Sequence, residues 1–166
     1  TPDRVLMFGS TSKLTLPVAG VAVLAASEAN IQDALKKMFY SAIGPDKINQ
    51  LRHVRFFKDM DGLRAHMDAQ AAIIGPKFAA VEDALQRRLA GKGIAKWTSP
   101  KGGYFVSVDV LDGCASEIIR FAGEAGVKLT PAGSTYPLGE DPNDRNIRLA
   151  PTMPTVGEVK SAMEVF

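Results

Sequence analysis

The stretch Val5-Leu6-Met7-Phe8-Gly9-Ser10-Thr11-Ser12-Lys13 contains the transition that decides the fold. Four apolar residues end abruptly in a small polar turn, which is typical of a buried strand that ends at a ligand-binding edge. Open α/β sheets bind their ligands at the carboxyl ends of the strands. A second apolar and partly β-branched stretch, Val18 to Ala26, follows the turn. We therefore expect two neighbouring strands joined by the loop that carries Lys13.

Lys13 is the first candidate functional residue. A lysine amine becomes a nucleophile toward carbonyl groups when its neighbours or partial desolvation favour the neutral form. The hydroxyl groups beside it, on Ser10 and Ser12, suit a nearby phosphate. The alternative is a surface lysine in a serine-rich turn, since short Ser-x-x-Lys patterns often occur by chance.

The composition narrows the class of protein. The chain has 166 residues, of which 46% are hydrophobic and 23% charged, as in ordinary globular proteins. Its net charge is only +2, and the basic residues carry no interleaved aromatics, so we expect no nucleic-acid partner. The longest apolar stretch, Leu16 to Ala26, is too short for a membrane helix and follows no signal peptide. The single cysteine, Cys114, excludes an internal disulfide and favours a cytoplasmic location.

Helices are expected in the middle of the chain. Caps at 27–30 precede a helix to about Tyr40, and Asp46 caps a second helix to about Lys58. A turn at 59–62 precedes one long amphipathic helix over 63–89, whose apolar residues recur at steps of three and four. Gly75-Pro76 lies inside it and is expected to kink or locally interrupt it.

The last part of the chain predicts a small α/β sandwich of roughly 75 residues. Short strands are expected over 94–97, 103–110, 127–130 and 146–150, with a helix over 115–125. Thr155 and Glu158 have the spacing of a capping box for a last helix over 156–166.

The loop also resembles a known family. Ser10-Thr11-Ser12-Lys13, with Pro17, Ala19 and Gly20, resembles the Schiff-base lysine segment of fold type I pyridoxal-phosphate enzymes, in particular class I/II aminotransferases. Further matches follow in the family's order: Pro100 to Phe105, Gly126-Val127, Pro131-Ala132-Gly133 and Asn146-Ile147-Arg148-Leu149. Gly44 to His53 and Tyr136 to Gly139 are most similar to a bacterial aspartate aminotransferase subgroup.

The resemblance implies a fold and a domain organisation. The fold class is α/β: the end of a large-domain sheet with the lysine, a long linking helix and a small α/β sandwich domain. The corresponding ranges are 1–62 for the remainder of the large domain, 63–92 for the interdomain helix and 93–166 for the small domain. Because the family's lysine lies past the middle of a longer polypeptide, we expect this chain to be the carboxyl-terminal part. A helix packed within one domain fits the periodicity of 63–89 equally well.

The resemblance also implies roles for residues around the cofactor. Lys13 would form the Schiff base with pyridoxal 5'-phosphate and then act as general base and general acid, which requires a partly desolvated amine. Ser10 and Ser12 would contact the phosphate. Most class I aminotransferases have a phosphate-binding arginine eight positions after the lysine, where this chain has Val21. Lys47 or Asn49 would then replace it, either within one chain or across a dimer interface.

Arg148 is the expected substrate-binding residue. A permanently charged side chain in an apolar strand needs a partner, and its planar fork suits the α-carboxylate of a substrate. The alternative is an ion pair with Asp141 or Asp144. His53 and His66 lie on separate predicted helices without a carboxylate or cysteine cluster, so no metal site is expected.

The implied function is transfer of an amino group from an L-amino acid, with aspartate the expected donor, to a 2-oxo acid such as 2-oxoglutarate, by a homodimeric enzyme. Two alternatives stay open. Another fold type I lyase or synthase would use the same lysine and arginine. A pyridoxal-phosphate-binding effector domain of a transcriptional regulator would have a basic helix-turn-helix segment upstream, and this chain contains none.

Overall fold

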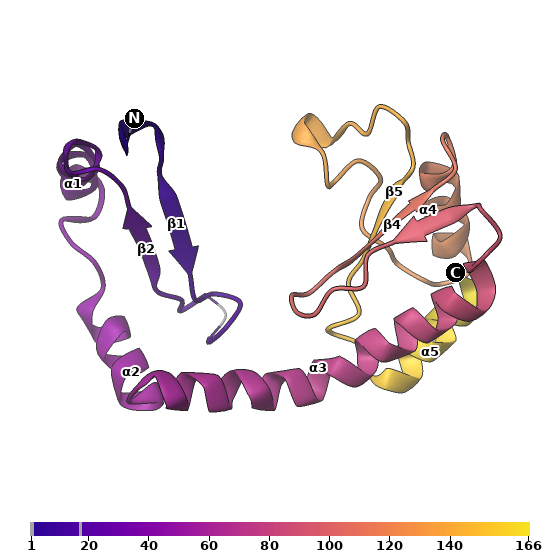
Figure 1. Cartoon of the computed structure of the whole chain (residues 1–166), viewed down its shortest axis with the longest axis horizontal. Helices are drawn as coiled ribbons and strands as arrows, with labels where there is room; N and C mark the ends of the chain where they lie inside the picture. Colours follow the sequence, from indigo (N-terminus) through magenta and orange to yellow (C-terminus); the bar gives the residue numbers. More distant parts are fainter. Residues whose placement is uncertain (1, 17) are drawn as a thin grey trace. The chain divides into compact units, whose positions relative to one another are not determined.

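The computed structural model describes residues 2–16 and 18–166, so Thr1 and Pro17 lie outside the described residues. The chain divides into two compact units, residues 1–69 and 70–166, which we call unit 1 and unit 2. Each unit has its own antiparallel sheet, of two strands in unit 1 and three in unit 2 (Figure 1). Together with the helices these sheets make a mixed α/β structure.

Unit 1 begins with the short 3-10 helix η1 (Pro2–Arg4), followed by the strands β1 (Met7–Ser10) and β2 (Ala22–Ala25). The strands pair antiparallel with Ser10 opposite Ala22, so the lysine loop joins two neighbouring strands as expected. β1 begins and ends two residues later than predicted, whereas β2 lies within the predicted range 18–26 but is shorter. The expectation of a buried strand is wrong for the described chain, where Phe8 is 77% and Val23 64% exposed. These side chains stay exposed because the described residues of unit 1 leave the faces of this two-stranded sheet largely uncovered.

The first two helices begin where the sequence places their caps. Helix α1 (Glu28–Ala42) starts after Ser27, whose hydroxyl accepts a hydrogen bond from the amide of Asn30 at 3.4 Å. Helix α2 (Lys47–Phe57) starts after Asp46, whose carboxylate accepts from the amide of Asn49 at 2.9 Å. Both caps satisfy an amide that has no partner inside its own helix.

The long helix α3 (Met60–Leu89) differs from the prediction at its start and at its proline. It begins three residues early because the carboxylate of Asp59 accepts from the amide of Gly62 at 2.9 Å. A Cβ on Gly62 would lie 1.9 Å from the carbonyl oxygen of Phe57, so this junction requires glycine. The helix continues through Pro76, so a local interruption is wrong, and the alternative of a kink at Gly75-Pro76 stays a prediction. Proline removes only its own amide from the hydrogen-bond ladder, and the other amides continue it.

Unit 2 contains the strands β3 (Ala95–Trp97), β4 (Val106–Val110) and β5 (Asn146–Leu149) in that spatial order. Helices α4 (Ala115–Glu124) and α5 (Val156–Val165) and the 3-10 helix η2 (Pro137–Gly139) complete it. The expected strand over 127–130 is wrong, since these residues form a loop. The amide of Val127 donates to the carbonyl of Ala122 at 2.7 Å and so closes the end of α4 instead of joining a sheet.

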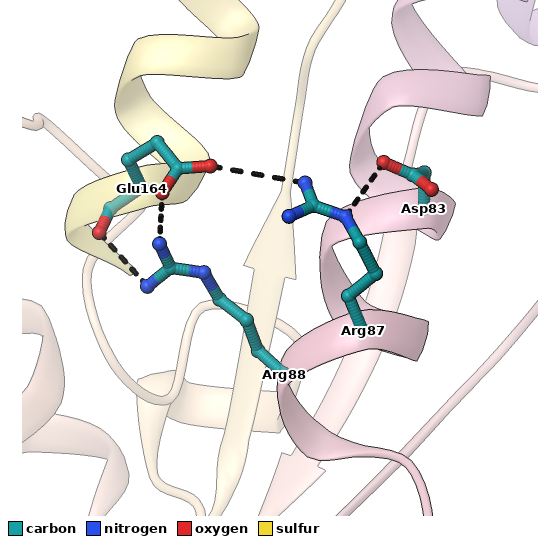
Figure 2. A network of polar contacts seen from close by, with 4 residues as sticks. All are labelled: Asp83, Arg87, Arg88 and Glu164. Carbon is teal, nitrogen blue, oxygen red and sulfur yellow. Dashed lines mark hydrogen bonds and ion pairs between the residues drawn. The ribbon is translucent and has the colours of Figure 1, made fainter.

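The core of unit 2 lies where α3 and α5 pack on the sheet. Its largest fully buried side chains are Val81 and Leu85 of α3, Val108 of β4 and Ile147 of β5. On the surface above this core, Glu164 of α5 pairs with Arg87 and Arg88 of α3 (Figure 2). Exposed ion pairs stabilise little, so apolar burial is the main force that holds α3 and α5 together.

The capping box of α5 is confirmed and carries a testable prediction. The hydroxyl of Thr155 accepts from the amide of Glu158 at 3.3 Å. Thr155→Ala removes this acceptor and is expected to lower the free energy of unfolding by about 0.5–2 kcal/mol. Urea denaturation of the complete protein measures the loss. Thr155→Ser is the matched control because it keeps the hydroxyl, and an equal loss in that variant would contradict the capping role.

The same cap predicts a pH dependence. The amide of Thr155 donates to the carboxylate of Glu158 at 2.7 Å, and this bond, with the Thr155 hydroxyl, holds the pKa of Glu158 below its ordinary value of 4.5. A carboxyl whose pKa is lowered by folding contributes stability above its unfolded pKa, and this contribution is lost as the pH falls through the folded pKa. The carboxylate's share of the cap is therefore expected to disappear in acid. Repeating the Thr155→Ala comparison below pH 4.5 should give a smaller difference than at pH 7.

Candidate functional site

The candidate site of unit 1 is the lysine loop, residues 11–21, between β1 and β2. The amide of Thr11 donates to the carbonyl of Val21 at 2.9 Å and extends the ladder of the two strands by one bond. The amides of Leu14 and Thr15 both donate to the carbonyl of Thr11, at 2.8 and 2.9 Å. Lys13 therefore lies in the middle of a single closed turn. It is exposed, so the described residues do not supply the partial desolvation expected of the catalytic amine.

Gly20 lets the two sides of the loop approach each other. A Cβ at this position would lie 2.4 Å from the hydroxyl oxygen of Ser12 and 2.9 Å from its backbone nitrogen. Real Cβ atoms do not approach backbone atoms so closely, so any larger residue would displace Ser12. The glycine quoted for the family resemblance thus has a steric role next to the lysine, whereas Pro17 from the same motif lies outside the described residues.

The predicted phosphate-binding residues lie on two elements of unit 1. The hydroxyl of Ser10 donates to that of Ser12 at 2.9 Å and accepts from the amide of Ser12 at 3.2 Å, so these two serines form a local pair before Lys13. Lys47 is the first residue of α2, and its side chain is exposed. Val21, at the position of the family's arginine, offers only backbone groups, and its amide donates to the hydroxyl of Thr11 at 2.8 Å.

Two residues of α2 that contact the lysine loop have roles that the sequence analysis missed. The side-chain amide of Asn49 donates to the carbonyl of Gly20 at 3.2 Å. Nε2 of His53 lies 3.0 Å from the hydroxyl of Thr15, and its Nδ1 lies 2.9 Å from the carbonyl of Asn49. The signal in the sequence is the spacing of four residues, which places Asn49 and His53 on one face of a helix.

A cavity of about 420 Å³ lies between α2, the start of α3 and the lysine loop, within unit 1. Thr11, Thr15 and His53 line it together with the apolar side chains of Val54, Phe57 and Leu63. The ring of His53 also lies 6.0 Å from that of Phe57, measured between centroids. The contact between His53 and Thr15 therefore lies at the wall of a cavity that is lined in part by apolar side chains.

The candidate site of unit 2 is Arg148 on β5. Its guanidinium carbon lies 4.6 Å from the ring centroid of Phe105, and its Nε is buried without a hydrogen-bond partner in the described part of the chain. A buried donor without a partner lowers the stability of the folded protein, because it has lost its hydrogen bonds to water. This guanidinium is therefore well suited to bind an acceptor. The carbonyl of Arg148 accepts from the hydroxyl of Thr130 at 2.8 Å, which fixes the strand beside the 127–130 loop.

The carboxylates expected as alternative partners of Arg148 are engaged elsewhere. Asp141 accepts from the amides of Arg145 and Asn146, at 2.9 and 2.8 Å. Burial raises the pKa of Asp141, but these backbone hydrogen bonds outweigh it and hold the pKa below its ordinary value. Asp144 accepts from both the amide and the hydroxyl of Ser116. Neither carboxylate therefore pairs with Arg148 in this structure.

A second cavity, of about 740 Å³, lies beside Arg148 within unit 2. It is bordered by residues 125–130, by the end of β5 and by α5. In residues 2–16 and 18–166, no three or more His, Cys, Asp or Glu side chains are grouped so that they could hold a metal ion. The helices in these same ranges include none that is both long and apolar enough to span a membrane.

Comparisons with known proteins agree with this arrangement. The family model described as "Aspartate amino-transferase" matches residues 1–166. The aspartate aminotransferase of Corynebacterium glutamicum is 48% identical over 163 residues, which are 98% of this chain and 38% of that protein. The crystal structure of an aspartate transaminase from Corynebacterium glutamicum superposes with a TM-score of 0.94 at 48% identity, over 99% of this chain and 39% of that one.

A more distant structure shares the fold. LysN, an α-aminoadipate aminotransferase of Thermus thermophilus, has a TM-score of 0.76 at 22% identity, over 97% of this chain and 40% of that one. The fold is thus that of fold type I aminotransferases, as the sequence motifs imply. The chain belongs to the aspartate amino-transferase family. It spans 38% of the length of the curated relatives it matches, in keeping with the expected carboxyl-terminal part.

Proposed function

We propose that this chain is part of a pyridoxal-phosphate-dependent aminotransferase that transfers the amino group of an L-amino acid, aspartate, to a 2-oxo acid such as 2-oxoglutarate. The observation that carries this proposal is the exposed Lys13 in a closed turn at the end of β1, in a chain of the aspartate amino-transferase family. The name of the Corynebacterium glutamicum relative supports aspartate as the amino donor.

The residues of the lysine loop fit the proposed cofactor. Lys13 offers an amine, and Ser10 and Ser12 offer two hydroxyls beside it. Lys47 offers a second cation, which would replace the family's arginine at the position where this chain has Val21. These four residues would hold pyridoxal 5'-phosphate, which supplies an electron sink when it is bound. LysN, which shares the fold, was crystallised with N-(5'-phosphopyridoxyl)-L-leucine, an adduct of the cofactor and an amino acid.

The chain's own residues have two tasks in this reaction. The amine of Lys13 accepts the proton from Cα of the bound amino acid and later returns a proton, which is general base and general acid catalysis. Arg148 binds the α-carboxylate through its planar fork, because its Nε lacks an internal partner and Phe105 holds the guanidinium plane. Binding the carboxylate at a fixed place orients Cα for proton transfer.

The proposed organisation follows the family: residues 1–62 belong to the large domain, 63–92 to the interdomain helix and 93–166 to the small domain. We also propose a homodimer located in the cytoplasm. Light scattering of the complete protein tests the homodimer, and fractionation of cells tests the cytoplasmic location.

A half-reaction assay tests the function. The complete enzyme, loaded with pyridoxal phosphate and mixed with aspartate alone, is expected to lose its visible cofactor absorbance and to regain it when 2-oxoglutarate is added. A lyase or synthase would release product without needing the 2-oxo acid. Binding of the amino acid without any turnover would favour the effector domain of a regulator, and either result would contradict the aminotransferase assignment.

A further inference from the structure

The lysine loop is held from outside by one face of α2. Asn49 contacts Gly20, near the end of the loop, and His53 contacts Thr15, two residues after Lys13. We propose that His53, acting through the hydroxyl of Thr15, is a positioning residue for Lys13. The inference rests on the proposed role of Lys13, but the contacts that carry it lie entirely within unit 1.

The positions of the protons follow from the partners of His53. A carbonyl oxygen only accepts, so Nδ1 of His53, 2.9 Å from the carbonyl of Asn49, must carry a proton. In the neutral ring Nε2 is then an acceptor, and the hydroxyl of Thr15, 3.0 Å away, donates to it. The ring is thereby fixed at both nitrogens, one against its own helix and one against the loop.

Thr15 transmits this contact to the turn that contains Lys13. Its amide donates to the carbonyl of Thr11 at 2.9 Å, and its hydroxyl oxygen lies 3.2 Å from that of Thr11. The hydroxyl of Thr11 in turn accepts from the amide of Val21, the residue before the start of β2. A continuous set of hydrogen bonds therefore runs from α2 across the base of the turn to the second strand.

The contact does not depend on one protonation state of His53. If the ring gains a second proton, Nε2 donates to the hydroxyl of Thr15, which can then donate to the carbonyl of Thr11 at 3.1 Å. The direction of the bond reverses, and its geometry stays. This arrangement holds the backbone on both sides of Lys13.

Hydrogen exchange of the cofactor-free complete protein tests the inference. His53→Leu and Thr15→Val each remove one partner of the same bond, so each is expected to speed exchange of the 11–21 segment by between about twofold and tenfold. The acceleration in the double variant should be smaller than the product of the two single effects, since the bond that the two residues share is lost only once. Single effects that multiply in the double variant would overturn the inference.

Two further variants separate positioning from general stability. His53→Gln places an amide oxygen near the position of Nε2 and should restore slow exchange. His66→Leu is the matched control, because His66 packs on Phe56 and Phe57 and forms none of the hydrogen bonds to the loop. Exchange that is equally fast in His66→Leu, or no rescue by His53→Gln, would overturn the proposal.

The effect on Lys13 itself is measured by its labelling with pyridoxal phosphate and borohydride. The labelling rate should fall by a similar factor in His53→Leu and recover in His53→Gln. Faster exchange with an unchanged labelling rate would overturn the positioning role. If Lys13 of the unchanged protein is never labelled, the proposed function fails, whereas the exchange results still decide whether His53 holds the loop.

Discussion

Lys13→Ala is expected to reduce transamination by the complete enzyme about 10²- to 10⁴-fold, the usual contribution of a general acid and base. The variant loses the only amine in the closed turn between Thr11 and Thr15, so no group at that position can accept the proton from Cα. Steady-state kinetics with aspartate and 2-oxoglutarate measures the loss. Because Lys13 is exposed, we expect the melting temperature of the cofactor-free protein to stay nearly the same.

Chemical labelling shows which lysine is responsible. Borohydride reduction of the loaded enzyme, followed by peptide mapping, should place the label on Lys13. Lys36→Ala is the matched control, since Lys36 is an exposed lysine of α1 and its removal should leave labelling and turnover unchanged. A label on Lys36, Lys47 or another lysine would disprove the assignment.

Arg148→Lys is expected to lower kcat/KM for amino acids about tenfold to somewhat over a hundredfold, the equivalent of a lost charge-assisted hydrogen bond of about 1.5–3 kcal/mol. Lysine keeps the charge but lacks the planar fork, so it cannot bind a carboxylate through two parallel bonds. It also loses the flat guanidinium that lies over Phe105. The effect is measured by comparing kcat/KM for amino acids with kcat/KM for simple amines. Because amines have no carboxylate, their kcat/KM should fall much less in this variant.

Arg145→Lys is the control for Arg148→Lys. Arg145 lies three residues earlier, and its Nε is also buried without a hydrogen-bond partner, but its guanidinium is 3.7 Å from the carboxylate of Asp112, an ion pair that Arg148 lacks in the described residues. This variant should keep the kcat/KM of the unchanged enzyme with both kinds of substrate. If kcat/KM in Arg148→Lys falls equally for amino acids and amines, the proposed carboxylate binding is wrong and Arg148 has a structural role. A loss of thermal stability large enough to explain the lower kcat/KM would lead to the same conclusion.

The starts of three helices and the hairpin around Lys13 depend on residues that are close together in the chain, so they could be predicted from the sequence. Ser27, Asp46 and Thr155 each accept a hydrogen bond from an amide three residues later, so the helices start where these caps stand. The hairpin around Lys13 was predictable for the same reason, because an apolar run, a polar turn and a second apolar run lie next to each other in the chain.

Contacts between distant residues decided the rest. Residues 127–130 alternate apolar and polar side chains as a strand does, but the amide of Val127 donates to the end of α4, so no ladder forms. The approach of His53 to Thr15 spans 38 residues, and neither residue carries a local pattern that reveals its partner. The unpaired Nε of Arg148 also appears only after folding, when Asp141 and Asp144 bind to backbone amides and to Ser116 instead.

The sequence by itself therefore determined the caps, the lysine turn and the order of the family's motifs, since these depend on residues within a few positions of one another. Only the tertiary structure decided which polar groups satisfy each other and which stay open to a ligand. The physical reason is that each buried donor or acceptor takes whichever partner folding brings within about 3 Å, and that choice depends on how whole elements pack.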